Sequence, residues 1–148
     1  MDRMMDEKRN LANGFNVTQA YPIGANASFN RYLFTCPAAF PDKVGALVIE
    51  DVVLVSDTAV TAHDTNYWSM QLVNLTKTED LMAAVITTKV TGGTAITADT
   101  AYRLTPDQNN SLGSSEVVEL QLTKAASATD LTAAVLSVVV VWRWKMGV

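Results

Sequence analysis

The sequence of 148 residues predicts one all-β domain, an antiparallel β-sandwich of about eight strands preceded by an extended N-terminal arm. Two apolar patterns indicate this fold class. Some segments alternate apolar and polar residues, which is typical of strands with one buried face, and others are apolar on both faces, like central strands. Turn-forming stretches separate these segments. We expect the arm to cover residues 1–20 and the sandwich residues 21–148.

The arm shows no strand period. Met4, Met5 and Leu11 could share a short helical face, but Asn and Gly residues interrupt it. A disordered terminus is one interpretation, and an arm that becomes ordered on a neighbouring subunit is the other. The second interpretation makes four apolar side chains candidate partner contacts. These are Met4, Met5, Leu11 and Phe15.

The first half of the sandwich contains two clear strands. Residues 28–35 are rich in aromatic side chains, and residues 44–55 form a long apolar run. Glu50 and Asp51 interrupt the second run, which predicts a bulge or bend that would let one run serve two sheets. We do not expect these carboxylates to act together, because neighbours on a strand point to opposite faces.

The second half predicts strands at residues 66–75, 81–90 and 117–122, with shorter ones at 95–98 and 102–104. Trp68, Met70 and Leu72 should share the buried face of the first of these. Val118, Leu120 and Leu122 should point inward from the third, with Glu119 and Gln121 outward. A turn is expected at Gly92-Gly93, and a polar loop at residues 105–115.

Residues 131–145 predict the closing strand. This segment is apolar on both faces between Ser137 and Val141, and left exposed it would aggregate. We therefore expect it to pair with a strand on each side. Beyond it, Trp142 and Trp144 should point one way, and Arg143 and Lys145 the other.

A short pattern occurs twice, at residues 75–86 and 122–136. Each copy reads Leu-Thr-Lys, a polar gap, and then Asp-Leu followed by small and apolar residues. We interpret both copies as hairpin corners at one end of the sandwich. Their charged residues are candidate partner contacts rather than chemical groups. These are Lys77, Glu79 and Lys124.

The composition argues against several classes of function. The net charge is −4 and the basic residues are scattered, whereas a duplex-binding domain would show a basic face, so we expect no nucleic-acid partner. The longest apolar run is far shorter than the ~20 residues of a membrane helix, and no signal-peptide pattern begins the chain. Cys36 is the single cysteine and His63 the single histidine, so neither a disulfide nor a zinc site is expected.

We also expect neither an enzyme nor a cofactor, because no nucleophile–base pair, metal cluster or phosphate loop is recognisable. Charged residues make up 18% of the chain, against about 25% in typical soluble domains. A surface rich in Thr, Ser and Asn explains this value, and so does a surface covered by partners.

The segment Ala59-Val60-Thr61-Ala62-His63-Asp64-Thr65-Asn66-Tyr67-Trp68 resembles a motif of small head proteins of tailed bacteriophages. So do Thr94-Ala95-Ile96-Thr97, the Leu-containing Tyr102-Arg103-Leu104, the turn from Gly113 to Glu116, and the Thr-Lys-small-small sequence that follows a strand. The resemblance covers residues 28–142. It implies a capsid decoration, or cement, protein with a jelly-roll-like β-sandwich.

The resemblance also implies a location and partners. The protein would be made in the host cytoplasm and bind the outer surface of the capsid of its phage. Its partners would be the major capsid protein and neighbouring copies of itself, with a trimer favoured and a dimer possible. The alternative is a carbohydrate- or receptor-binding β-sandwich on the virion surface, which would use exposed aromatic side chains. By pattern most of the candidates lie in strand cores; they are Tyr21, Tyr32, Tyr67, Trp68, Tyr102, Trp142 and Trp144.

Overall fold

The structure is a computed structural model that describes residues 16–22, 28–40, 44–125, 128 and 135–146. This part of the chain forms ten strands and no helix. The all-β prediction is therefore confirmed. The strands are β1 (Asn16–Pro22), β2 (Phe29–Thr35), β3 (Val44–Ser56), β4 (Trp68–Asn74), β5 (Glu79–Asp80), β6 (Ile86–Thr87), β7 (Ala101–Leu104), β8 (Ser111–Leu112), β9 (Val117–Lys124) and β10 (Val135–Met146).

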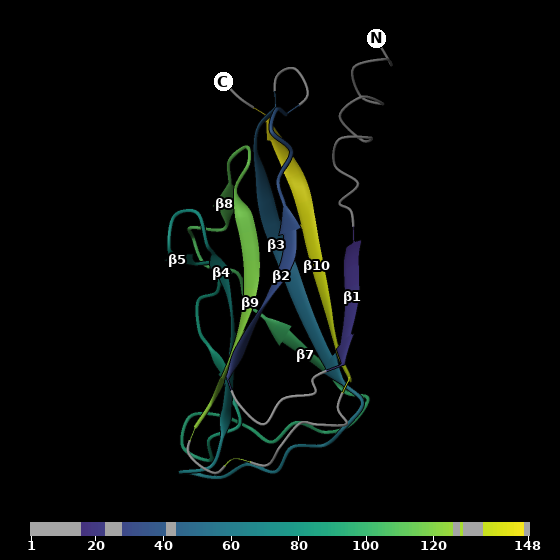
Figure 1. Cartoon of the computed structure of the whole chain (residues 1–148), viewed down its shortest axis with the longest axis vertical. Coiled ribbons are helices and arrows are strands. Elements are labelled where there is room, and N and C mark those ends of the chain that lie inside the picture. The colour runs from purple at the N-terminus through teal and green to yellow at the C-terminus, as the bar shows by residue number, and fades with distance from the viewer. Residues whose placement is uncertain (1–15, 23–27, 41–43, 126–127, 129–134, 147–148) are drawn as a thin grey trace.

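The strands form two antiparallel sheets (Figure 1). The β10 sheet has the order β1-β10-β3-β7, with β8 also paired to β3. The β9 sheet has the order β2-β9-β4-β5, with β6 also paired to β4. The hydrophobic core lies between them and includes Trp68, Leu54 and Leu120, which are almost fully buried. This is the predicted antiparallel sandwich.

The pairings are nested in chain order. β1 pairs with β10, β2 with β9, β3 with β7, and β4 with β5 and β6. Such nesting describes a long antiparallel ribbon wound around the core, closed by the lateral pairs β10–β3 and β9–β4. This is the jelly roll, so the expectation from the resemblance is confirmed. About eight strands were expected; β8 is an additional two-residue strand, and β5 and β6 together occupy one position.

The predicted bulge is present in β3. Val141 of β10 pairs with Asp51 and Trp142 pairs with Ile49, so Glu50 is the extra residue. The buried face changes phase there, from Ile49 before the bulge to Val52 after it. The expectation that the bend lets β3 serve two sheets is wrong, because β10 pairs with β3 on both sides of the bulge.

The two carboxylates at the bulge do not point to opposite faces. The Nε of Arg143 donates to Glu50 at 2.5 Å, and Arg103 forms an ion pair with Asp51. Both arginines lie on the outer face of the β10 sheet, because their neighbours along each strand face the core. Both carboxylates therefore reach the outer face. The sequence expectation is wrong because a bulge sets two residues of one strand against one of its neighbour.

The closing strand agrees with the prediction from residue 135 onward; residues 131–134 of the predicted strand lie outside the described residues. β10 pairs with β1 on one side and β3 on the other, so its backbone N–H and C=O groups are not left open to pairing with other chains. Trp142 is buried and Trp144 packs against the core. Arg143, which is bound to Glu50, and the exposed Lys145 alternate with these tryptophans and lie on the other face of the strand.

Residues 81–90 do not form the expected single strand. Only β5 and β6 border β4 in this region, and residues 83–85 between them are exposed. The Ala83 N–H donates to the Thr105 carbonyl at 3.0 Å, and Met82 forms a bridge with Pro106. The loop at residues 105–110 therefore draws the chain away from β4, which no local pattern reveals.

Glu119 faces away from the core, as expected, but it is only 3% exposed. It lies on β9 between Tyr32 of β2 and Val73 of β4, and it accepts a hydrogen bond from the Gln121 side chain at 3.0 Å. Neighbours on both sides of a central strand cover such a carboxylate even when it faces away from the core.

Part of the expected arm belongs to the sheet. Residues 16–20 lie in β1, whose register with β10 runs from Asn16 opposite Val141 to Pro22 opposite Val135. The pairing uses main-chain groups and satisfies the second edge of β10, so it does not require an alternating sequence. Residues 1–15 lie outside the described residues.

Candidate interaction surface at one end of the sandwich

Three connecting segments meet at one end of the sandwich, which we call the corner end. They are residues 36–40 after β2, residues 75–78 between β4 and β5, and residues 113–116 before β9. Backbone hydrogen bonds join them: the Cys36 N–H donates to the Glu116 carbonyl at 2.8 Å, and the Leu75 N–H donates to the Val117 carbonyl at 2.9 Å. The corner end is thus an ordered surface built from segments that adjoin β9 and its two neighbours, β2 and β4.

A buried carboxylate organises the corner end. Glu116 is 7% exposed, and its Oε1 lies 2.8 Å from the Lys77 ammonium. Its Oε2 accepts a hydrogen bond of 2.6 Å from the Asn74 side-chain amide. The Asn74 Oδ1 in turn accepts the Lys77 backbone N–H at 3.3 Å. The three residues form a closed network that fixes the β4–β5 corner against the turn before β9.

The network controls protonation at the corner end. Burial would raise the pKa of Glu116, but hydrogen bonds from Lys77, the Gly113 backbone and Asn74, together with the Lys77 charge, hold the pKa below its ordinary value. The hydrogen bond to Glu116 raises the pKa of Lys77. Both groups are therefore charged over a wide range around neutral pH.

The two loops need unusual backbone conformations to make this contact. Thr78 has φ of 58° and Ser115 has φ of 61°, both in the left-handed region. A Cβ at Gly113 would lie 3.0 Å from the Glu116 Oε1, so a larger residue there would displace the carboxylate. The Val117 N–H donates to the Thr76 hydroxyl at 3.1 Å, which adds a further link between the loops.

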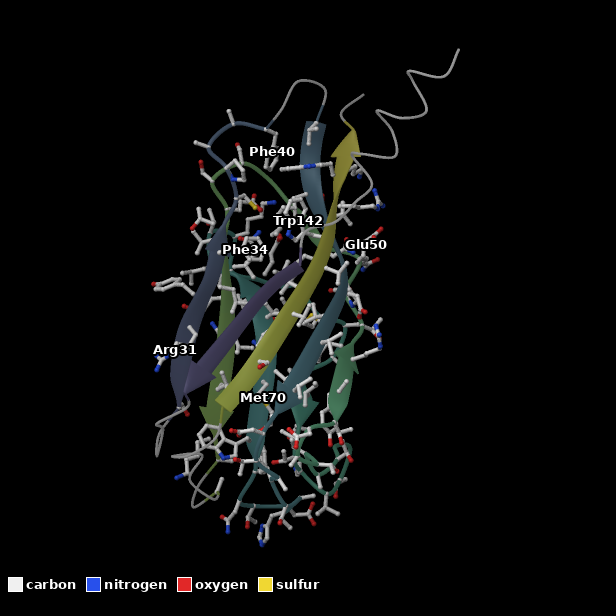
Figure 2. All side chains as sticks on the ribbon, turned by 90° about the vertical axis from the view of Figure 1, so that its right-hand side faces the viewer. Arg31, Phe34, Phe40, Glu50, Met70 and Trp142 are labelled. Carbon is white, nitrogen blue, oxygen red and sulfur yellow. The ribbon has the colours of Figure 1, made fainter. Side chains whose placement is uncertain are left out.

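An apolar pocket opens beside the network, between the ends of the two sheets. Its volume is about 310 Å³. Trp144 contacts Phe40 and Trp142 edge to face, with ring centroids 5.3 Å and 5.0 Å apart. Figure 2 shows Phe34, Phe40 and Trp142 together at this end of the molecule. The pocket is lined by Phe34, Thr35, Cys36, Pro37, Leu47, Trp142 and Trp144.

Cys36 links the pocket to the network. It is buried and unbonded to another cysteine, and its backbone N–H binds the Glu116 carbonyl. Burial, followed by the nearby Glu116 charge, raises the pKa of the Cys36 thiol to about 11. The thiol therefore remains neutral at physiological pH and contributes to the apolar lining.

The structure separates the candidate contact residues. Lys77 and Glu79 lie at the corner end. Lys124 pairs with Trp68 at the opposite end of β4, whereas Val118 pairs with Asn74 near the corner end. Seven paired residues of β4 and β9 lie in this ladder, which separates the two lysines by about 20 Å at ~3.3 Å per residue. Met4, Met5, Leu11 and Phe15 lie outside the described residues.

The expectation that both copies of the repeat lie at one end is therefore wrong. The first copy is a hairpin between β4 and β5, as expected. The second leaves β9 in one sheet and leads to β10 in the other, so it is a crossover between sheets. Similar residues have different roles here because strand order, which is non-local, decides where each segment continues.

His63 has a local structural role. Its Nδ1 accepts hydrogen bonds from the backbone N–H groups of Thr65 and Asn66, at 3.1 Å and 3.0 Å. Within the described ranges, no three His, Cys, Asp or Glu side chains are grouped so that they could hold a metal ion. The same part of the chain contains no helix long and apolar enough to cross a membrane.

The pairing of Asn74 with Glu116 was not predicted from the sequence, although the sequence contains a signal for it. Asn74 continues the inward phase of Trp68, Met70 and Leu72. Glu116 likewise precedes Val118 in the inward phase of β9. A polar residue in the buried phase at a strand end needs a polar partner, and two such residues on neighbouring strands can supply each other.

No family model matches the sequence, and no curated protein sequence matches it. Among solved structures, the chain is similar to a chain of infectious bursal disease virus, Gx strain, with 13% sequence identity and a TM-score of 0.29. The match covers 93% of this chain and 37% of the viral one.

Proposed function

We propose that the chain is a structural virion protein that binds the outer surface of a tailed-bacteriophage capsid and stabilises it as a decoration protein. The observation that carries the proposal is the nested jelly-roll pairing, an architecture that viral capsid proteins share with lectins and cupins. Within that group, the resemblance of residues 59–68 and 94–97 to phage head proteins favours the virion role. Binding is the function proposed, and no catalytic step is part of it.

The corner end is the surface that we assign to the capsid. The Glu116 network holds the β4–β5 corner rigid, so Lys77 and Glu79 are presented without a large loss of conformational entropy on binding. Lys77 keeps 43% of its side chain exposed although it is bound to Glu116. A charged rim beside an apolar pocket is the usual anatomy of a protein–protein interface.

The proposed partners are the major capsid protein and neighbouring copies of the chain, in a trimer or a dimer, on the outer capsid surface. A small stabilisation of the shell by each bound copy suffices, because many copies act on one shell. The apolar residues of the N-terminal segment, Met4, Met5 and Leu11, would add contacts beyond the folded domain. The protein would be made in the host cytoplasm and added to the finished shell.

The test is to add the purified chain to shells of its phage that lack it, and to measure bound protein by sedimentation. We expect saturable binding and a higher melting temperature of the shell. Glu79→Lys should weaken binding, because it reverses an exposed charge at the corner end. Lys124→Glu is the matched control, since it reverses a charge at the opposite end and should bind normally. Absence of binding by the unmodified chain would refute the proposal.

Tyr32 is the observation that favours the saccharide-binding alternative. It is 67% exposed on β2, and its position opposite Glu119 places it on the outer face of the β9 sheet. Gln71 and Gln121 lie on the same face, where their side chains are hydrogen bonded at 3.4 Å. Specific binding on a glycan array, abolished by Tyr32→Ala, would favour this alternative over the capsid role.

A further inference from the structure

The apolar pocket at the corner end has aromatic and aliphatic walls, and no side chain of the described residues fills it. Leu47 and Trp142 in its lining are buried, whereas Phe34 and Trp144 are only partly buried. Its volume of about 310 Å³ is near the lower limit of small-molecule sites, roughly 300 Å³. A pocket of this size and polarity suits one large apolar side chain.

Strand β1 begins beside this pocket. Its first described residue, Asn16, pairs with Val141, which immediately precedes Trp142 in the pocket wall. Residues directly opposite each other in an antiparallel pair lie on the same face of the sheet. One more residue of the same register would place residue 15 opposite Trp142, on the face that lines the pocket.

The sequence has an aromatic residue at this position. Phe15 is the only aromatic residue among the first fifteen, and the first nine residues include three acidic and three basic ones. The charged residues lie at least six positions before Phe15, so the phenylalanine can be buried in an apolar site without bringing a charge with it. Leu11 is four residues further from β1 and is not placed by the register.

We propose that the pocket receives the Phe15 side chain of the same chain. This contact would fix the end of the N-terminal segment that adjoins β1 at the corner end. The inference does not depend on the capsid role. It changes the assignment of Phe15 from a partner contact to an intramolecular anchor. Met4 lies eleven residues before Phe15, so an anchored segment could extend its contacts by up to roughly 36 Å.

Cys36 supplies the test, since it is the single cysteine of the chain and lines the pocket. The rate at which a soluble disulfide reagent modifies the thiol should be measured in the full chain and its variants at one pH. Docked Phe15 covers the thiol, so Phe15→Ala should raise the rate about tenfold, which corresponds to about 1.4 kcal/mol. Phe15→Leu should restore most of the protection.

Two matched variants separate docking from general effects. Leu11→Ala makes a similar truncation in the same segment and should leave the rate within about twofold of the unmodified chain. Val60→Ala removes a buried side chain that pairs with Ile96, away from the pocket lining, and measures what a loss of stability alone does to Cys36. It should not reproduce the effect of Phe15→Ala.

Three results would overturn the proposal. The first is an equal rate in the unmodified chain and in Phe15→Ala. The second is protection that rises with protein concentration, because the occupant would then come from a second copy. The third uses a deletion of residues 1–14, which keeps Phe15 and must keep Cys36 protected even if Phe15→Ala fails to fold. Loss of protection in that deletion would contradict the anchor.

Discussion

The Lys77 ammonium lies 2.8 Å from the Glu116 carboxylate, and this ion pair joins the β4–β5 corner to the turn before β9. Asn74 completes the contact from the end of β4. Because Glu116 is buried, its hydrogen bonds are protected from water and contribute more than an exposed pair would. The shape of the corner end therefore depends on one carboxylate.

Replacing Glu116 by Gln should reduce the free energy of unfolding and make it depend less on pH in the acidic range. The folded protein lowers the pKa of Glu116 below its ordinary value of 4.5, so the stabilisation is present above that pH and is lost as the pH falls through the folded pKa. At pH 7, Glu116→Gln should lower the free energy of unfolding by about 1–3 kcal/mol. Urea unfolding at several pH values from neutral to acidic measures both effects.

Glu79→Gln is the control for this experiment, because Glu79 is exposed on the same corner. It should change the free energy of unfolding by less than about 0.5 kcal/mol. If Glu116→Gln and the unmodified chain lose stability in parallel as the pH falls, the buried network does not have the role assigned to it.

Cys36 should make the protein less stable in alkali. Its pKa is raised from 9.0 to about 11 on folding, so the folded state keeps a proton that the unfolded chain releases in this range. Stability should fall as the pH rises from 9 toward 11, by about 1.4 kcal/mol for each unit of pKa difference. Cys36→Ala should flatten this part of the profile, and an unchanged slope would show that Cys36 is not responsible.

Deleting Glu50 should be tolerated, although the residue lies inside a long strand. The bulge places Glu50 as the extra residue between Ile49 and Asp51, so its removal restores regular pairing and alternation. The loss includes the exposed pair with Arg143, which contributes about 0–1 kcal/mol. The total loss in urea unfolding should remain below about 2 kcal/mol.

Deletion of Val53 is the matched comparison, since it removes one residue from the same strand. It shifts the phase of the buried face by one, and either turns Leu54 outward or brings Asp51 into the core. That variant should not fold. If both deletions were equally damaging, the assignment of Glu50 as the extra residue would be wrong.

Periodic patterns predicted the parts of the fold that depend on local burial. The inward phase of Trp68, Met70 and Leu72 is confirmed because a half-buried strand repeats every two residues. The paired β10 strand is confirmed because an exposed strand of that composition would aggregate. The bulge at Glu50 was visible as a charge inside an apolar run.

Features that depend on strand order could not be predicted in this way. Lys77 and Lys124 follow the same short pattern, but antiparallel pairing of β4 with β9 places them at opposite ends. The break in residues 81–90 depends on contacts with Thr105 and Pro106, which are distant in sequence. The candidate site at the corner end could not be predicted for the same reason, because Cys36, Asn74 and Glu116 come together only through the pairing of β2 and β4 with β9.

The most direct test of the capsid role is a cryo-electron microscopy map of phage shells incubated with a saturating amount of the full chain. We predict regularly placed density on the outer surface that fits the jelly roll, with Lys77 and Glu79 facing the shell. Shells whose outer surface carries no added density under these conditions would contradict the central claim.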